Sequence, residues 1–182
     1  MKKVQLFFLS VCLLVSGTIT RLSAQGNAFI RQDTLLSVLP GYQAKLKSLD
    51  SLKTVFSDEL KAEQQKLEQK ISALITPYNP QANETSESLL ARLSPADASR
   101  YSIIQKEAAL IEEKKKSYNE ILDNYYKQNV QPLISKLNAT IEGYAIKNKY
   151  DMVFILEDIA PALAYVNKGK DITLAIIQLI KK

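Results

Sequence analysis

Leucine and phenylalanine recur along residues 42–75 at alternating intervals of three and four residues. The apolar members of this register are Leu46, Leu49, Phe56, Leu60, Leu67 and Leu74, and Lys53, Glu63 and Lys70 occupy the positions between them. Such a heptad pattern is typical of helices that supercoil around one another, not of a single helix packed on a sheet. The sequence therefore predicts a long helix, about 50 Å in length, that pairs with another helix.

A second helical pattern follows a break rich in proline and asparagine at residues 76–88. Its start signal is strong, because Ser94 can cap a helix, Pro95 suits the first helical position and Asp97 favours the positive end of the helix dipole. The pattern places Ile104, Ala108, Ile111, Tyr118, Ile121, Leu122 and Tyr125 on one face. We expect a short helical piece at residues 89–93 and predict that residues 42–131 form an antiparallel helical hairpin. Such an arm indicates holding or bridging rather than catalysis.

Pro132 interrupts the second helical pattern, which resumes at Leu133 and continues to Ile146. Proline inside a helix removes a hydrogen bond and clashes with the preceding turn. We interpret Pro132 as a kink where the arm meets a compact base. Two separate helices are the alternative.

The N-terminus has the pattern of a signal peptide over residues 1–24. Lys2 and Lys3 precede an apolar run of about a dozen residues that is too short to span a bilayer. Cleavage after Ala24 would remove Cys12, the sole cysteine. Lipidation of that cysteine is disfavoured because the bulky Val11 precedes it. We therefore expect an exported, periplasmic protein that is not stably inserted in a membrane.

The composition excludes several classes of function. The chain has no histidine, and without Cys12 it has no thiol, so disulfide scaffolds, thiol enzymes and zinc sites built on His or Cys are excluded. Nothing indicates a catalytic residue, a metal site or a cofactor. Removal of Lys2, Lys3 and Arg21 leaves 21 basic and 19 acidic side chains, and residues 43–130 hold 13 of each. No basic stripe of the kind that binds nucleic acid is present.

The flanks of the hairpin carry short apolar runs typical of strands. We predict strands at residues 28–30, 152–156 and 162–166, a turn at 157–161, and a final helix over 172–180 that Asp171 caps. The fold class is α+β, with a long coiled-coil hairpin (42–131) inserted into a small β-containing base (25–41 and 132–182). So small a sheet exposes its edges and buries little apolar area, so we expect the base to oligomerise through its strands. The side chains expected in the base core and oligomer interface are Phe29, Ile30, Phe154, Leu156 and Tyr165.

The order of these features resembles the Skp/OmpH family of periplasmic chaperones. The resemblance rests on the Leu39-Pro40-Gly41-Tyr42 start of the long helix, on Val130-Gln131-Pro132-Leu133, on Tyr150-Asp151-Met152-Val153 and on Asp171-Ile172-Thr173. It implies a homotrimer whose strands build a shared body and whose three hairpins enclose a cavity for unfolded outer-membrane proteins. The hairpin tip is longer than the family pattern, and the arm is neutral where familiar members are basic.

We therefore interpret the chain as a holdase chaperone that works without ATP and binds unfolded outer-membrane β-barrel proteins. The side chains expected to contact such clients lie beside the seam: Tyr42, Leu52, Val55, Ile103 and Leu110. Two alternatives remain open from the residues. One is an exported structural coiled-coil spacer or stalk, and the other is a lipid or cell-wall enzyme that uses carboxylates.

Overall fold

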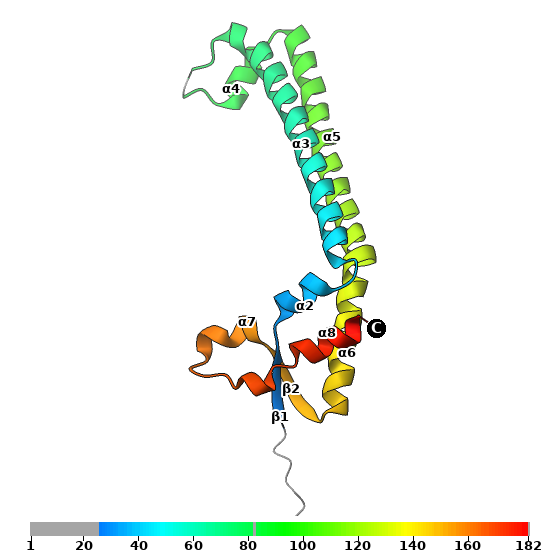
Figure 1. Ribbon diagram of the computed structural model, residues 1–182. Coiled ribbons are helices and arrows are strands. Elements are labelled where there is room, and N and C mark those ends of the chain that lie inside the picture. Colours follow the sequence, from blue (N-terminus) through cyan, green and yellow to red (C-terminus); the bar gives the residue numbers. More distant parts are fainter. Residues whose placement is uncertain (1–25, 82, 182) are drawn as a thin grey trace, which may run out of the picture. The chain divides into compact units, whose positions relative to one another are not determined.

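The computed structural model describes residues 26–81 and 83–181, so the predicted signal peptide lies outside the described residues (Figure 1). The chain divides into two compact units. One consists of the chain up to Pro40 together with the chain from Lys136 onward, and the other spans Gly41–Ser135. We call the first unit the base and the second the hairpin.

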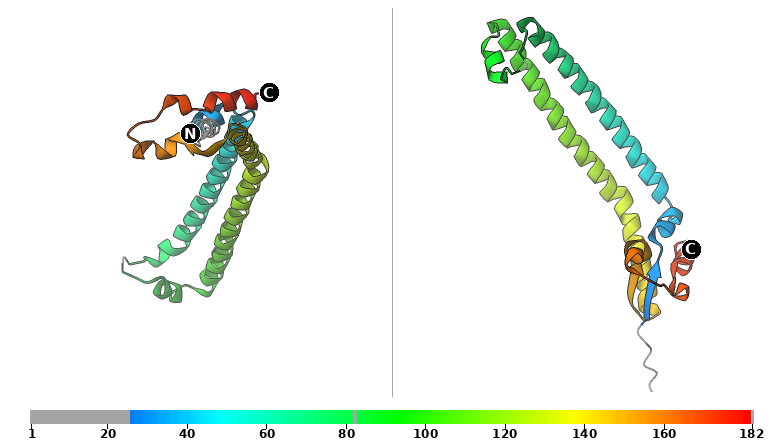
Figure 2. Two further views of the ribbon diagram at one scale, coloured as in Figure 1. Left: turned by 90° about the horizontal axis from the view of Figure 1, so that it is seen from below. Right: turned by 90° about the vertical axis from the view of Figure 1, so that its left-hand side faces the viewer.

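The hairpin consists of two long antiparallel helices that lie side by side (Figure 2). Helix α3 spans Tyr42–Ile75, as the heptad pattern predicted, and α5 spans Pro95–Tyr125. Gly41 precedes α3 with a φ of 80°, a left-handed conformation that glycine adopts without steric cost. Glycine therefore suits the position directly before the helix.

The tip of the hairpin holds two short helices. The 3₁₀ turn η1 (Thr76–Tyr78) follows α3, and α4 covers Ser86–Ala91, a few residues earlier than the piece expected at 89–93. The predicted start of α5 is confirmed, because Ser94 Oγ accepts a hydrogen bond from the Asp97 backbone N–H at 3.1 Å and Pro95 is the first helical residue.

Helix α5 continues without a break into the π-helical segment η2 (Tyr126–Val130) and then into α6 (Gln131–Lys147). The alternative of two separate helices is therefore wrong. The irregularity lies just before Pro132, where the Gln131 N–H donates to the Tyr126 carbonyl five residues earlier. A wider turn accommodates a proline ring that would otherwise clash with the carbonyl of the residue four positions before it.

The base is built on a two-stranded parallel sheet. Strand β1 (Gly26–Ile30) pairs with β2 (Tyr150–Ile155) in a register that joins Phe29 to Phe154 and Ile30 to Ile155. Helix α2 (Gln32–Val38) contacts the last helix, α8 (Thr173–Ile180). The base core lies among these elements, where Ala28, Ile30, Leu35, Leu137, Ile172 and Ile176 are buried.

Asp171-Ile172-Thr173 fastens α8 to the end of β1. Asp171 Oδ1 accepts from the Thr173 N–H at 3.0 Å, but the helix starts at Thr173 and its N-cap residue is Ile172, so the predicted cap position at Asp171 is wrong by one residue. The Ile172 N–H donates to the Phe29 carbonyl, and the buried Thr173 Oγ1 accepts from the Arg31 N–H at 2.9 Å. This three-residue motif thus satisfies the backbone of β1 on the side away from β2.

The prediction of a third strand at 162–166 is wrong. Residues 156–170 instead form α7 (Leu156–Ile159), the 3₁₀ turns η3 (Ala160–Ala162) and η4 (Lys168–Lys170), and an irregular stretch between the two 3₁₀ turns. The expected turn at 157–161 is correspondingly helical. A strand needs a neighbour to pair with, and within the described residues the sheet has only β1 and β2.

Candidate functional site

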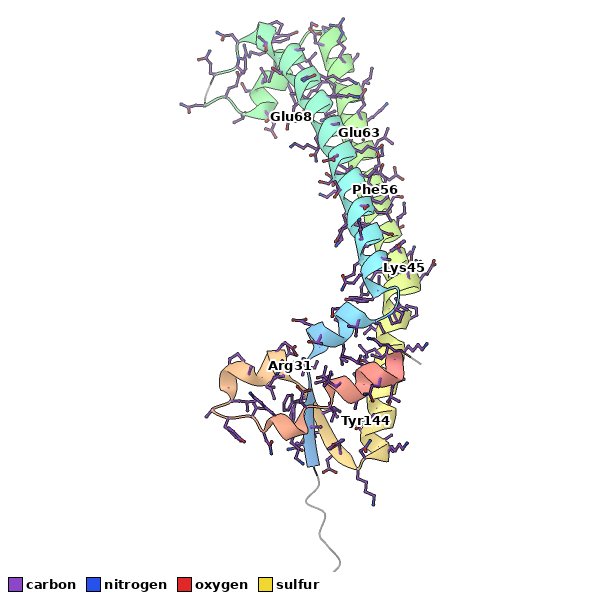
Figure 3. All side chains as sticks on the ribbon, in the orientation of Figure 1. Arg31, Lys45, Phe56, Glu63, Glu68 and Tyr144 are labelled. Carbon is purple, nitrogen blue, oxygen red and sulfur yellow. The ribbon has the colours of Figure 1, made fainter. Side chains whose placement is uncertain are left out.

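Apolar side chains close the seam between α3 and α5. The buried members come from both helices: Leu49, Leu74, Ile104 and Ile111. Phe56 of α3, labelled in Figure 3, lies about midway along the hairpin. In the middle of the seam the rings of Phe56 and Tyr118 stack, with centroids 4.0 Å apart and planes 8° from parallel. The heptad register of the sequence therefore corresponds to the packed interface of the hairpin.

A polar cluster bridges the two helices beside that aromatic pair. The Lys114 ammonium donates to Glu63 Oε1 at 2.6 Å and also to Glu59, and the Tyr118 hydroxyl donates to Glu59 Oε2 at 2.5 Å. The hydrogen bonds from Lys114 and Tyr118 lower the pKa of Glu59. Those to Glu59 and Glu63 raise the pKa of Lys114, and the bond to Glu59 raises the pKa of Tyr118. All three groups thus keep their neutral-pH charge states.

A second ion pair lies one heptad closer to the tip, where Lys70 Nζ is 2.6 Å from Glu107 Oε2. Glu63 and Lys70 are seven residues apart on α3. Their partners, Lys114 and Glu107, are also seven residues apart on α5, in the opposite direction. A shift of one helix along the other would separate both pairs. The two pairs therefore favour one antiparallel register, as polar groups do at coiled-coil seams.

An open groove runs between α3 and α5 on one face of the hairpin. It has two sections, of about 350 and 370 Å³, which share Lys70 and Glu107 in their walls. Leu110 lines one section and Ile103 the other, and these side chains are 62% and 56% exposed. The groove is thus an accessible apolar surface, divided by an ion pair.

The five side chains proposed to contact clients differ in exposure. Ile103 and Leu110, which the sequence places beside the seam, line the groove. Val55 is also exposed, whereas Leu52 and Tyr42 are half-buried. Tyr42 precedes Leu49 by one heptad and so continues the seam register, which makes it the weakest member of the set.

Ile121 was missed as a surface residue. The helical pattern of the sequence predicts a seam position for it, together with Tyr118 and Leu122, but its side chain is 43% exposed. The usable signal is its spacing from Leu110, because eleven residues complete close to three helical turns and put both side chains on one line. That line lies beside the seam, not on it.

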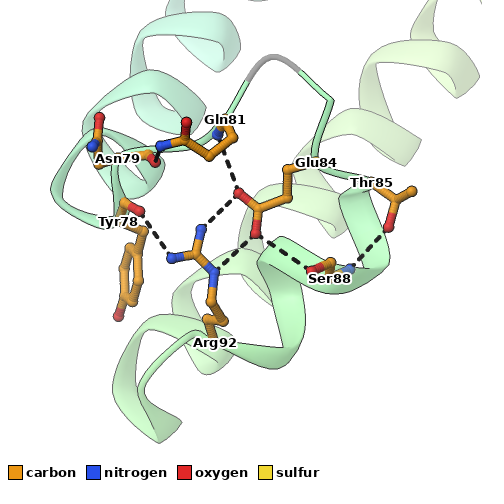
Figure 4. Close-up of polar contacts among 7 residues, drawn as sticks. All are labelled: Tyr78, Asn79, Gln81, Glu84, Thr85, Ser88 and Arg92. Carbon is orange, nitrogen blue, oxygen red and sulfur yellow. Dashed lines mark hydrogen bonds and ion pairs between the residues drawn. The ribbon is translucent and has the colours of Figure 1, made fainter.

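The tip is held by a network of polar contacts (Figure 4). Arg92 donates to both carboxylate oxygens of Glu84, at 2.9 and 2.6 Å, and to the Tyr78 carbonyl at 3.1 Å. This guanidinium lowers the pKa of Glu84. The Tyr78 hydroxyl donates to Asp97 Oδ2 at 2.6 Å and accepts from the Ser94 N–H at 2.9 Å. These bonds tie the loop after α3 to the start of α5.

The base contains an open apolar hollow of about 520 Å³. Four of the five predicted core and interface side chains line it: Phe29, Phe154, Leu156 and Tyr165. The fifth, Ile30, is buried in the core and is not part of the lining. Tyr165 is 80% exposed, which leaves the outer side of the hollow open to solvent.

Within residues 26–81 and 83–181, no group of three or more histidine, cysteine, aspartate or glutamate side chains could hold a metal ion. In the same residues, no helix combines the length and the apolar character that crossing a membrane requires.

The fold and the groove define a class of proteins in which a long antiparallel helical hairpin, with apolar side chains open along one face, interrupts a small α+β base. The family described as outer membrane protein (OmpH-like) matches residues 27–180. The chain belongs to the OmpH-like family.

A solved structure confirms the fold at low sequence identity. It comes from Caulobacter crescentus CB15, and its description names an outer membrane chaperone that is OmpH-like. The TM-score is 0.53 at 15% identity, and the match covers 85% of this chain and 83% of that chain. No curated protein matches the chain.

Proposed function

We propose that the protein is an ATP-independent holdase chaperone of the periplasm that binds unfolded outer-membrane β-barrel proteins and prevents their aggregation. The observation that carries the proposal is the open groove of the hairpin, where Ile103 and Leu110 remain accessible. Membership of the OmpH-like family, in which a structural relative is described as a chaperone, supports it. Holding a client by such contacts needs neither a catalytic residue nor a nucleotide.

The apolar contacts of one arm are few, so a single hairpin would hold an unfolded chain weakly. Several arms acting on one client would raise the overall affinity while each contact stays reversible. We propose that the working unit is a homotrimer assembled through the base. The exposed hollow beside Phe154 and Tyr165 supports this, and so does β2, which in the described residues pairs only with β1 and so has a free edge.

The periplasmic location rests on the signal-peptide pattern of residues 1–24 and on the family. In that compartment the clients would be unfolded barrel strands, whose lipid-facing side chains alternate with polar ones and aggregate in water. The groove offers these side chains an alternative apolar surface.

The test is light scattering of the purified mature protein, alone and after dilution of a urea-unfolded outer-membrane barrel protein into it. We expect an oligomer that forms a soluble complex and suppresses client turbidity without ATP. A rod-like monomer or dimer that leaves the client to precipitate would contradict the proposal and favour the structural spacer.

A further inference from the structure

We propose that the hairpin has one client-binding face and one inert face, and that the binding face receives an extended, uncharged apolar segment of the client. This inference rests on the proposed holdase function and assigns its contact surface. The binding face is the one that carries the groove. The inert face is the opposite side of the same two helices.

Three exposed aliphatic side chains form a line along the binding face of α5. Ile103 and Leu110 are seven residues apart and Ile121 follows after eleven more, so the steps complete close to two and three helical turns. All three are exposed. The line is therefore about 27 Å long at 1.5 Å per residue, and only one side chain wide.

Helix α3 contributes to the same face. Lys66 and Ala73 line the groove, and Leu52 belongs to their seven-residue series. Glu59, the remaining member of that series, contacts Lys114, which itself lines the groove. The sequence-predicted Leu52, Ile103 and Leu110 thus share one face of the hairpin, although Leu52 lies nearer the start of α3, outside the groove. Val55, three residues after Leu52, lies along the outer margin of that face.

The opposite face is polar over the middle of the hairpin. On α5, Gln105, Glu112 and Asn119 repeat at seven-residue intervals about half a turn away from the line of Ile103 and Leu110, and all three are exposed. On α3 the corresponding positions, two residues after Leu52, Glu59 and Lys66, are exposed and polar as well: Thr54, Lys61 and Glu68. Over this middle stretch an apolar client segment finds no comparable partner. Nearer the tip, Ile71 and Ile75 line a separate open hollow of about 410 Å³ on the side of α3 that carries Glu68.

The shape of the binding face favours an extended chain as its occupant. A globular partner needs a broad patch, whereas this surface is long and narrow. Its length of about 27 Å equals roughly eight residues of extended chain at 3.3 Å each. A transmembrane β-strand has about 9–11 residues, so one barrel strand spans the whole line.

The charges of the groove favour an uncharged occupant. Lys70 pairs with Glu107, Lys114 with Glu59 and Glu63, and Arg100 with Asp97. A polyanion would have to displace these carboxylates. Among the described residues, Lys66 is the one cation of the groove walls that forms no ion pair. A single free cation is too little charge to select an anionic partner.

The experiment places a photo-crosslinking benzophenone side chain at Ile103 or Leu110, and at Gln105 or Glu112 as the matched positions two residues further along. Each variant is mixed, as the mature oligomer, with a urea-diluted barrel protein and irradiated. We expect client adducts several-fold stronger from positions 103 and 110, and unchanged when the salt concentration is raised.

A loss-of-contact pair completes the design. The double variant I103S/L110S should suppress client aggregation several-fold less well than the wild type, whereas Q105S/E112S should match it, with circular dichroism confirming the helices of both.

Equal crosslinking from the two faces would overturn the two-faced arm while leaving the holdase function intact. Strong loss of adducts in salt, or their displacement by lipopolysaccharide, would overturn the uncharged occupant. Failure of the unmodified protein to bind any client would overturn both proposals.

Discussion

Single residues decide how far the stability of the hairpin depends on pH. The hydrogen bonds from Lys114 and Tyr118 lower the pKa of Glu59 below its usual value of 4.5. A carboxyl group whose pKa is lowered by folding contributes stability above its unfolded-state pKa, and that contribution is lost as the pH falls through the folded-state value. Glu59 therefore stabilises the hairpin at neutral pH and stops doing so in acid.

We predict that Glu59→Gln reduces the acid sensitivity of the hairpin. The melting temperature of the wild type should fall more between about pH 7 and about pH 3 than that of the variant, because the variant has no charge to lose at this position. Thermal melts by circular dichroism measure the difference. Glu68→Gln, an exposed carboxylate of the same helix, is the control and should behave as the wild type. An identical acid response in E59Q would contradict the prediction.

Thr173 is the residue on which the attachment of α8 to β1 depends most directly. Its buried hydroxyl accepts from the Arg31 N–H, so Thr173→Val leaves that backbone donor without a partner. A fully buried donor left without a partner costs about 1–3 kcal/mol; this bond is part-buried, so we expect urea unfolding to show a loss near the lower end, about 1 kcal/mol. Thr54→Val, which removes an exposed hydroxyl bonded within α3, should change the unfolding free energy by less than about 0.5 kcal/mol. Equal effects of the two changes would argue against a special role for Thr173.

At the scale of elements, the long helices could be predicted from the sequence and the third strand could not. The bounds of α3 follow from a heptad register that begins after Pro40–Gly41 and ends before Pro77, all of which is local information. Residues 162–166 have the composition of a strand, but strand formation depends on a partner elsewhere. Within the described residues no such partner is present, and the segment is irregular.

The candidate site shows the same division. The exposure of Ile103 and Leu110 beside the seam could be predicted from helical spacing, since both lie one position before a seam residue. The exposure of Ile121 follows from the same rule, because Ile121 lies one position before the seam residue Leu122 and eleven residues after Leu110. The cross-helix pairs of Lys114 and Lys70 depend on the register between helices, which no single helix encodes.

The start of α5 allows a test at this scale. Ser94 Oγ accepts from the Asp97 N–H, so Ser94→Ala should destabilise the hairpin by about 1 kcal/mol, the usual cost of losing a helix N-cap. Ser99→Ala changes an exposed serine one turn later to the best helix former and should be neutral or slightly stabilising. Urea denaturation of the two variants measures both effects. A hairpin that tolerates S94A as well as S99A would show that the tip network, not the cap, sets this helix boundary.

At the scale of the whole molecule, the base has the features of a subunit rather than of a self-sufficient domain. It pairs two strands, leaves one edge of β2 free and keeps an apolar hollow open to solvent. A strand-like segment next to that hollow remains irregular in the single chain. These features have a common explanation if another copy of the chain covers the hollow and offers the segment a partner.

Substitutions at Tyr165 and Leu174 distinguish a subunit interface from ordinary surface exposure. Both are among the most exposed large apolar side chains of the base, at 80% and 74%, but only Tyr165 lines the hollow. Neither supports the core of its own chain, so Tyr165→Asp and Leu174→Asp should each leave the fold of the single chain intact.

If copies assemble over the hollow, a buried unpaired carboxylate at 165 would be strongly unfavourable there, and Y165D should dissociate the oligomer. Light scattering should then report a single-chain mass for Y165D and the wild-type mass for L174D. Client binding by Y165D should weaken as well, because each arm would then act alone and the gain from several simultaneous contacts would be lost. A Y165D protein that keeps its oligomeric mass would place the subunit interface elsewhere on the base.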